Sequence, residues 1–309
     1  MSTMITSHFK SRDGVHKIRY HIWFPELEPV GIVQIAHGMA EYALRYADFA
    51  SYLTAHGFVV CANDHLGHGG SVNEPGELGY FSPLNGWENV VKDMHSLTKI
   101  MKESYPELPY FLFGHSMGSF LARAYTTWFG YELTGAVYCG TAGPVKAGEM
   151  MLIAVDAAKR RHHNEPYYRS ETLNKAAFGA YNKRIADQRT PYDWISRDDE
   201  VVDKYMADEL CGFTFTLNGF ENLGKVLWFV SQEKWFSTIR KDLPILLIAG
   251  EADPVGAYGE GVKKVFNKLI SYSAHARIRL YDSARHELIN ELNREEVFKD
   301  VLDFLETYI

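Results

Sequence analysis

The chain has 309 residues, 46% of them hydrophobic and 23% charged, which is the composition of a globular protein that builds a full core without disulfide or metal staples. Its net charge of −7 argues against nucleic-acid binding, because contacts to phosphate require clustered lysine and arginine. The short basic run at residues 159–163 is interpreted as the solvated end of a helix.

Strand-like and helical segments alternate through the first part of the chain. Residues 30–36 form a nearly continuous apolar run, which is typical of a strand buried on both faces of a parallel sheet. Ahead of this run, the turn signal Arg12-Asp13-Gly14 joins two predicted strands. The pattern predicts strands at 4–10, 16–24, 30–36, 58–62, 110–113 and 134–139, and helices at 43–56, from Trp87 to about Pro106, and at 117–129.

The alternation stops between residues 142 and 235, where the sequence has helical stretches and no clear strand pattern. It resumes with strands at 244–249 and 276–281, a helix at 258–271 and a last helix with apolar positions 297, 301, 304, 305 and 308. Repeated βα units predict an α/β fold with a mostly parallel sheet flanked by helices. We predict a core of residues 1–141 and 236–309, and a helical cap, or lid, at 142–235 over the carboxyl ends of the strands, where such folds bind ligands.

The three cysteines, Cys61, Cys139 and Cys211, lack metal-ligand spacing and are interpreted as buried free thiols in a reducing compartment. The start of the chain is polar and shows no signal peptide. No window of about 18 uninterrupted apolar residues predicts a transmembrane segment. We therefore expect a soluble, cytoplasmic protein.

The segment Gly114-His115-Ser116-Met117-Gly118 matches the G-x-S-x-G pattern of a nucleophilic serine. It follows a predicted strand and precedes a predicted helix, as this pattern requires. The turn is sharp, so small residues are needed two positions before and two positions after the serine. The helix N-terminus that follows favours developing negative charge. Ser116 is therefore the predicted nucleophile.

A nucleophilic serine needs a base, and the base needs a third group that holds its tautomer. For this pattern the chain order is serine, then acid, then histidine. Asp253 and His286 each follow a later predicted strand, so both are expected at the same edge of the sheet as Ser116. Asp282 is the rival acid, but it lies close to its strand, shortly before His286. We predict Ser116, Asp253 and His286 as the catalytic residues.

Acyl transfer also needs backbone N–H groups aimed at the developing oxyanion. One donor is expected from Met117, directly after the nucleophile, and the other from Met39, in the loop that follows the strand at 30–36. The His- and Asp-containing segment 64–71 raises the alternative of a metal site. Its glycines favour a tight structural loop, and we expect no metal.

With these motifs in place, the chain resembles the serine aminopeptidase-type branch of the α/β-hydrolases that holds the monoacylglycerol lipases and lysophospholipases. The resemblance covers both predicted halves of the core. It implies a cap domain, esterase or lipase activity on single-chain acyl esters, no cofactor, and the same triad and oxyanion residues. The motifs that carry it are His37-Gly38-Met39-Ala40-Glu41, Arg45-Tyr46, residues 64–71, residues 114–118, Asp253-Pro254-Val255 and Arg285-His286-Glu287.

The predicted cap is rich in aromatic residues, which either line an acyl pocket or form the small core of the cap itself. Phe213, Phe215 and Phe220 are the predicted substrate-binding residues, because they follow a polar helical stretch near the return to the sheet. The sequence therefore assigns substrate selection to the insertion.

Three functions stay open at this point. The first is hydrolysis of a small-molecule acyl ester through an acyl-enzyme. The second is a proline iminopeptidase-like peptidase or amidase, which needs carboxylates for a free amine. Residues 198–200 offer such carboxylates, although a solvated helix start is the simpler interpretation. The third is a non-catalytic ligand-binding protein. The sequence leaves open transient membrane contact by the cap and the oligomeric state.

Overall fold

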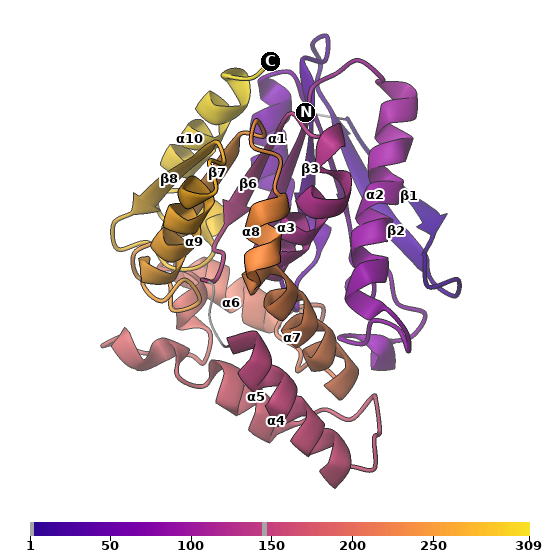
Figure 1. The fold of residues 1–309 in the computed structure, drawn as a ribbon, viewed down its shortest axis with the longest axis vertical. Helices are drawn as coiled ribbons and strands as arrows, with labels where there is room; N and C mark the ends of the chain where they lie inside the picture. The colour runs from indigo at the N-terminus through magenta and orange to yellow at the C-terminus, as the bar shows by residue number, and fades with distance from the viewer. Residues whose placement is uncertain (1–2, 144–146) are drawn as a thin grey trace.

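The computed structural model describes residues 3–143 and 147–309, and its centre is one eight-stranded sheet in the order β1-β2-β4-β3-β5-β6-β7-β8 (Figure 1). β2 pairs antiparallel with both β1 and β4, and every pairing from β4 to β8 is parallel. The sheet is therefore mostly parallel, as predicted. Its strands are β1 (Thr3–Lys10), β2 (Lys17–Phe24), β3 (Gly31–Ala36), β4 (Phe58–Asn63), β5 (Tyr110–His115), β6 (Gly135–Cys139), β7 (Ile245–Gly250) and β8 (Ala276–Tyr281).

Helices cover both faces of the sheet. Neighbouring residues of a strand point to opposite faces, and Ile32 and Val33 of β3 belong to two separate hydrophobic clusters. The cluster around Val33 includes the buried sides of α1 (Ala47–Ala55) and α10 (Arg294–Glu306). The cluster around Ile32 includes α2 (Gly86–Ser104), α3 (Met117–Phe129) and α9 (Glu260–Ser271).

Between β6 and β7 the described residues contain helices and no strand. Helices α4 and α5 lie together beyond one end of the sheet, at the bottom of Figure 1, and α7 connects α4 to the core by contacting α2 and α3. Residues 144–146, inside the predicted insertion, lie outside the described residues. The helices here are α4 (Ala147–Arg161), α5 (Glu171–Phe178), α6 (Asp199–Ala207), α7 (Leu217–Ser231) and α8 (Glu233–Thr238).

Most predicted elements occur where the apolar pattern places them, and α3 and β8 have the predicted bounds. The main difference is at 43–56, where a 3-10 turn, Ala43–Tyr46, precedes α1. Asp64 accepts the Ala43 amide at 2.9 Å, which ties this turn to the loop after β4. The three cysteines are buried and unpaired, as predicted. Among the described helices, none has the length and apolar character that a membrane crossing requires.

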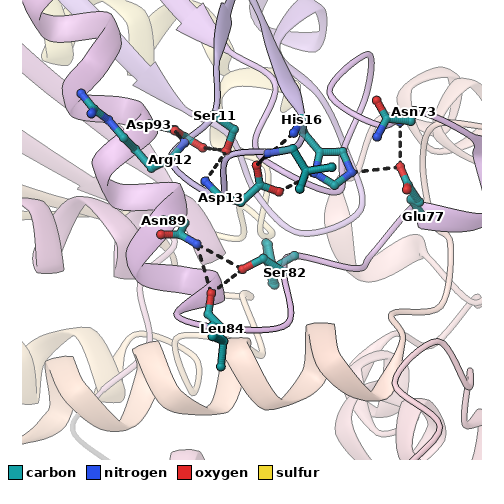
Figure 2. Close-up of polar contacts among 12 residues, drawn as sticks. Ser11, Arg12, Asp13, His16, Asn73, Glu77, Ser82, Leu84, Asn89 and Asp93 are labelled. Carbon is teal, nitrogen blue, oxygen red and sulfur yellow. Dashed lines mark hydrogen bonds and ion pairs between the residues drawn. The ribbon is translucent and has the colours of Figure 1, made fainter.

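A buried polar cluster anchors the turn between β1 and β2 to α2, on the side of the sheet away from β8 (Figure 2). Asp93 of α2 accepts hydrogen bonds from the Ser11 hydroxyl and the Arg12 amide, both at 2.7 Å. Burial raises the pKa of Asp93 to about 7. Nearby, His16 lies between the carboxylates of Asp13, at 2.5 Å, and Glu77, at 3.1 Å. The N-terminal hairpin is thus held by side chains as well as by strand pairing.

Candidate active site

Ser116 lies in the sharp turn between β5 and α3. Its φ of 52° and ψ of −121° form a strained backbone conformation for a residue with a Cβ atom. The flanking glycines leave the space that this turn needs, because a Cβ at Gly114 would overlap the carbonyl oxygen of Gly118, and a Cβ at Gly118 would overlap that of Ala36. These contacts give the physical reason for small residues on both sides of the serine.

His286 and Asp253 meet at the same edge of the sheet. The Nδ1 atom of His286 is 2.9 Å from Oδ2 of Asp253, and both side chains are buried. The other oxygen of Asp253 accepts the Val255 amide at 2.8 Å, which fixes the orientation of the carboxylate. The rival acid, Asp282, is exposed. The structure therefore brings together the predicted histidine and the predicted acid.

The charge state of His286 depends on its buried neighbours. Burial alone would lower the pKa of His286, but the facing Asp253 carboxylate raises it above its ordinary value. The ring of His115 lies 4.7 Å from the His286 ring, and burial holds the pKa of His115 well below its usual range. His115 is therefore neutral, and it adds no second positive charge beside His286.

The predicted oxyanion donors, Met39 and Met117, both line the cavity that contains Ser116. Met117 is the first residue of α3, so its amide has no partner within the helix. In the part of the chain that the structure describes, neither backbone N–H group donates a hydrogen bond. Two free amides beside the predicted nucleophile are what stabilisation of an oxyanion requires.

The cavity has a volume of about 950 Å³ and two unlike walls. We call residues 38–41, 115–117 and 286–287 the floor; they lie at or after the carboxyl ends of β3, β5 and β8. We include in the floor the side chains of Arg45 and Asp253, which pair with Glu41, Glu287 and His286. We call the lining residues between 150 and 227 the roof. They are mainly apolar and include Met151, Leu173, Phe178, Phe213, Leu223 and Leu227.

One of the three predicted substrate residues lines the cavity, and two do not. Phe213 is part of the roof, whereas Phe215 and Phe220 are fully buried outside the lining. The ring of Phe215 packs against Phe81 of the core, with centroids 5.8 Å apart, and Phe220 packs against Phe215. The sequence interpretation is therefore corrected for Phe215 and Phe220, which join the helical segment to the core.

The sequence reasoning did not assign a site role to Trp194, but the structure places it against the predicted base. Its ring centroid lies 5.1 Å from that of His286, and its carbonyl accepts the His286 amide at 3.4 Å. In the sequence, Trp194 was one aromatic residue of many in the insertion, and no local pattern distinguishes it.

Three charged residues of the floor were also missed as site residues. Glu41 and Glu287 line the cavity, and Arg45 forms ion pairs with both. Glu287 directly follows His286, and Glu41 lies shortly after Met39 in the same motif. That closeness to predicted site residues is the signal by which the sequence could have revealed them.

Other segments singled out in the sequence have structural roles. Asp64 accepts the amides of Ala43 and Gly70, so the segment 64–71 is a tight loop. No group of three or more metal-binding side chains occurs among the residues that the structure describes. Asp198 caps α6 through the Glu200 amide, which makes residues 198–200 a helix start, as interpreted. The basic run begins at the C-terminal end of α4.

Comparisons with known proteins agree on one group. The family model described as "Serine aminopeptidase, S33" matches residues 27–293. The monoacylglycerol lipase of Mycolicibacterium smegmatis is 29% identical over 312 residues, covering 100% of this chain and 99% of that protein. The monoglyceride lipase of Homo sapiens is 34% identical over 299 residues, covering 92% of this chain and 84% of that protein.

A solved structure agrees with these matches. The crystal structure of a highly thermostable carboxyl esterase from Bacillus coagulans superimposes with a TM-score of 0.92 and 32% identity, over 100% of this chain and 99% of that one. The fold is therefore the α/β-hydrolase fold, and the resemblance seen in the sequence motifs is confirmed.

Proposed function

Because the chain belongs to the serine aminopeptidase S33 family of α/β-hydrolases, we propose that Ser116, His286 and Asp253 are its catalytic triad and that a monoacylglycerol is its substrate. The chain is a carboxylic ester hydrolase. The observation that carries the triad is the buried hydrogen bond between His286 and Asp253, in one cavity with the strained Ser116.

In the first half of the reaction, His286 accepts the hydroxyl proton of Ser116, and Ser116 Oγ attacks the acyl carbonyl carbon. The carbonyl oxygen becomes an oxyanion, which the amides of Met39 and Met117 stabilise. When this intermediate collapses, the bond to the alcohol oxygen breaks and His286 gives its proton to the leaving alcohol. Ser116 then carries the acyl group as an ester.

In the second half, His286 removes a proton from water, and the resulting hydroxide attacks the acyl-enzyme. Collapse of the second intermediate releases the carboxylic acid and returns the proton to Ser116. Asp253 keeps the histidine in one tautomer and stabilises its charged form throughout, which agrees with the raised pKa of His286.

The substrate proposal follows from the two walls of the cavity. An apolar roof suits a single acyl chain, whereas the polar floor suits the ester and its alcohol. We infer that residues 142–235 act as a cap that supplies this roof. The named relatives are monoacylglycerol lipases, which favours a glycerol ester.

A substrate panel tests this proposal. We expect the highest kcat/KM for a monoacylglycerol, compared with a lysophospholipid, a short p-nitrophenyl ester and a proline amide. Preference for the lysophospholipid would contradict a monoacylglycerol as the substrate and would make a lysophospholipid the proposed substrate instead. Preference for the proline amide would support the peptidase alternative, which has little support because Asp199 and Glu200 are exposed at a helix start outside the cavity lining.

A fluorophosphonate probe separates an active hydrolase from a non-catalytic ligand-binding protein. We expect the probe to label Ser116 in the native chain and to leave Ser116→Ala unlabelled. Absence of labelling in the folded native chain would contradict the proposed nucleophile.

We also propose that the cap makes transient contact with lipid surfaces. On α4, Met150 and Ile153 are 67% and 71% exposed, and Met150 also lines the cavity. Lys159, Arg160 and Arg161 at the end of this helix would favour anionic lipids. Co-sedimentation with phosphatidylglycerol vesicles should exceed that with phosphatidylcholine vesicles. Double substitution of Met150 and Ile153 by serine should reduce it, and unchanged binding would contradict this role of α4.

A further inference from the structure

Three charged residues form a buried ion-pair network in the floor. One guanidinium nitrogen of Arg45 lies 2.7 Å from Oε2 of Glu41 and 2.7 Å from Oε1 of Glu287, and the other nitrogen lies 2.7 Å from Oε2 of Glu287. All three side chains are largely buried. Burying charges is costly and gives little net stability, so their presence here requires another explanation.

One end of the network holds the loop that carries the proposed oxyanion donor. Oε1 of Glu41 accepts the Gly38 amide at 2.5 Å and the Tyr46 hydroxyl at 2.8 Å. A Cβ at Gly38 would lie 3.2 Å from Cβ of Ser116, so this backbone passes directly beside the nucleophile. Glu41 therefore fixes the residue immediately before Met39.

The other end holds the loop that carries the proposed base. Glu287 is the next residue after His286, and its Oε2 atom also accepts a hydrogen bond from Asn290 at 3.0 Å. Its backbone amide donates to the carbonyl of Ile195 at 2.7 Å. Glu287 is thus immobilised from three directions, and the backbone that it fixes is directly bonded to His286.

The sheet itself does not connect these two loops. They follow β3 and β8, and β5, β6 and β7 lie between those two strands. Arg45 joins them directly, although Glu287 is 242 residues away in sequence. The network is therefore a short side-chain bridge between loops on either side of the turn that carries Ser116.

We propose that Glu41, Arg45 and Glu287 are positioning residues that hold the Met39 amide and His286 at a fixed separation across Ser116. The inference rests on the triad proposed above. A small displacement of an oxyanion donor or a base reduces the rate of the chemical step, whereas binding of the acyl chain in the roof is left intact.

The network also affects the charge of His286. The carboxylates of Glu287 and Glu41 both favour its protonated form, after Asp253. Burial would raise the pKa of Glu287, but the ion pair with Arg45 lowers it below its usual range. The groups facing His286 are Asp253 from the loop after β7, Glu41 from the loop after β3, its neighbour Glu287, neutral His115 from β5 and the uncharged ring of Trp194.

The test compares Glu41→Gln, Glu287→Gln and Arg45→Met on a short, soluble p-nitrophenyl ester. Each rate is expressed per active site titrated with a fluorophosphonate, so that misfolded protein is not counted. We expect kcat to fall roughly 10- to 100-fold, with KM within about threefold of the native value, because an oxyanion donor or base is displaced while binding is retained.

Two further readouts separate positioning from a merely structural role. The double variant of Glu41→Gln and Glu287→Gln should lose about as much kcat as the worse single variant, because both carboxylates act through Arg45. In Glu287→Gln, the acid limb of the profile of kcat/KM against pH should move to lower pH, because His286 loses one of the carboxylates that favour its charged form.

Asp93→Asn is the matched control, because Asp93 also accepts one backbone amide and one hydroxyl but lies on α2, which lines no part of the cavity (Figure 2). It should leave kcat unchanged, whatever its effect on Tm. Unchanged kcat in all three network variants, or a rise in KM alone, would overturn the positioning role. Activity retained in Ser116→Ala would overturn the proposed triad and the network together.

Discussion

The floor and the roof of the cavity differ in composition and in the way they are held. The floor lies at the carboxyl ends of parallel strands, and it contains the buried acidic and basic side chains of Asp253, Glu41, Arg45 and Glu287 beside the strained Ser116. The roof consists of helices whose lining is mainly apolar. Electrostatic positioning needs fixed backbone, whereas an acyl chain needs only apolar surface of suitable shape.

The two walls contact each other at several points, and the backbone carbonyl of one floor residue makes two of these contacts. The carbonyl of Ala40, in the floor, accepts the Gly212 amide at 3.0 Å and the Tyr205 hydroxyl at 3.1 Å, both from the helical segment. Arg45 also lies under the Tyr205 ring, 4.8 Å from its centroid. Under the proposed function, chemistry and selectivity are therefore separable: changes in the floor should alter kcat, and changes in the roof should alter the preferred chain length.

The largest effect should come from the floor. Asp253→Asn should reduce kcat by roughly 10³- to 10⁴-fold, because the amide no longer stabilises the imidazolium and holds the wrong tautomer. Steady-state kinetics on a monoacylglycerol would measure this loss. The matched control is Asp282→Asn, since Asp282 is exposed, and it should keep native activity. Equal losses in both variants would remove Asp253 from the triad.

The next effect should fall on stability. Phe215→Ala should lower the free energy of unfolding by about 3–5 kcal/mol, because it removes a fully buried ring between the roof segment and the core. Urea unfolding would measure the change. The acyl-chain-length profile of Phe215→Ala should match that of the native chain, and a shifted profile would show that this ring contacts the substrate.

Phe213→Ala should have the opposite pattern. Phe213 lines the cavity and is only partly buried, so its removal should cost less stability and enlarge the acyl site. We expect the preferred chain length to move toward longer acyl groups, with kcat on the short p-nitrophenyl ester within about threefold of native, because the floor is intact. A panel of monoacylglycerols from short to long chain measures this shift. An unchanged profile would mean that the roof does not select the acyl chain.

The last prediction concerns a buried acid outside both walls, and we expect it to affect stability alone. The pKa of Asp93 is raised by burial from 3.8 to about 7, so its protonated form is favoured in the folded chain. The stability that this provides is complete below pH about 4 and is lost as pH rises through about 7. As the pH is raised from about 4 to about 7, the Tm of the native chain should therefore decrease relative to the Tm of Asp93→Asn. Parallel Tm profiles would contradict this role.

Local sequence patterns predicted the elements well, because they depend on short-range physics. The apolar runs of the central strands and the helical spacing from Trp87 depend on which faces are buried, and both are visible within a few residues. Ser116 was predictable for the same reason, since its turn, its glycines and its helix are contiguous. Asp253 and His286 required one further rule, that parallel strands end at one edge of the sheet.

The residues that line the roof could not be predicted in this way. Phe213 and Phe215 stand two positions apart in a stretch without helix or strand, so no period assigns them to a face. Contacts with Phe81 bury Phe215, and Phe81 lies far away in sequence. Trp194 is placed against His286 by a similarly distant contact.

Short-range sequence patterns were enough to predict the α/β architecture, the proposed nucleophile and the order of its proposed partners, because strands, helices and tight turns follow from neighbouring residues. The choice of insertion residues that face the cavity, and the link that Arg45 makes between Glu41 and Glu287, became visible in the folded structure. The physical reason is that both depend on packing between segments as many as 242 residues apart, where burial and charge pairing are set by the whole fold.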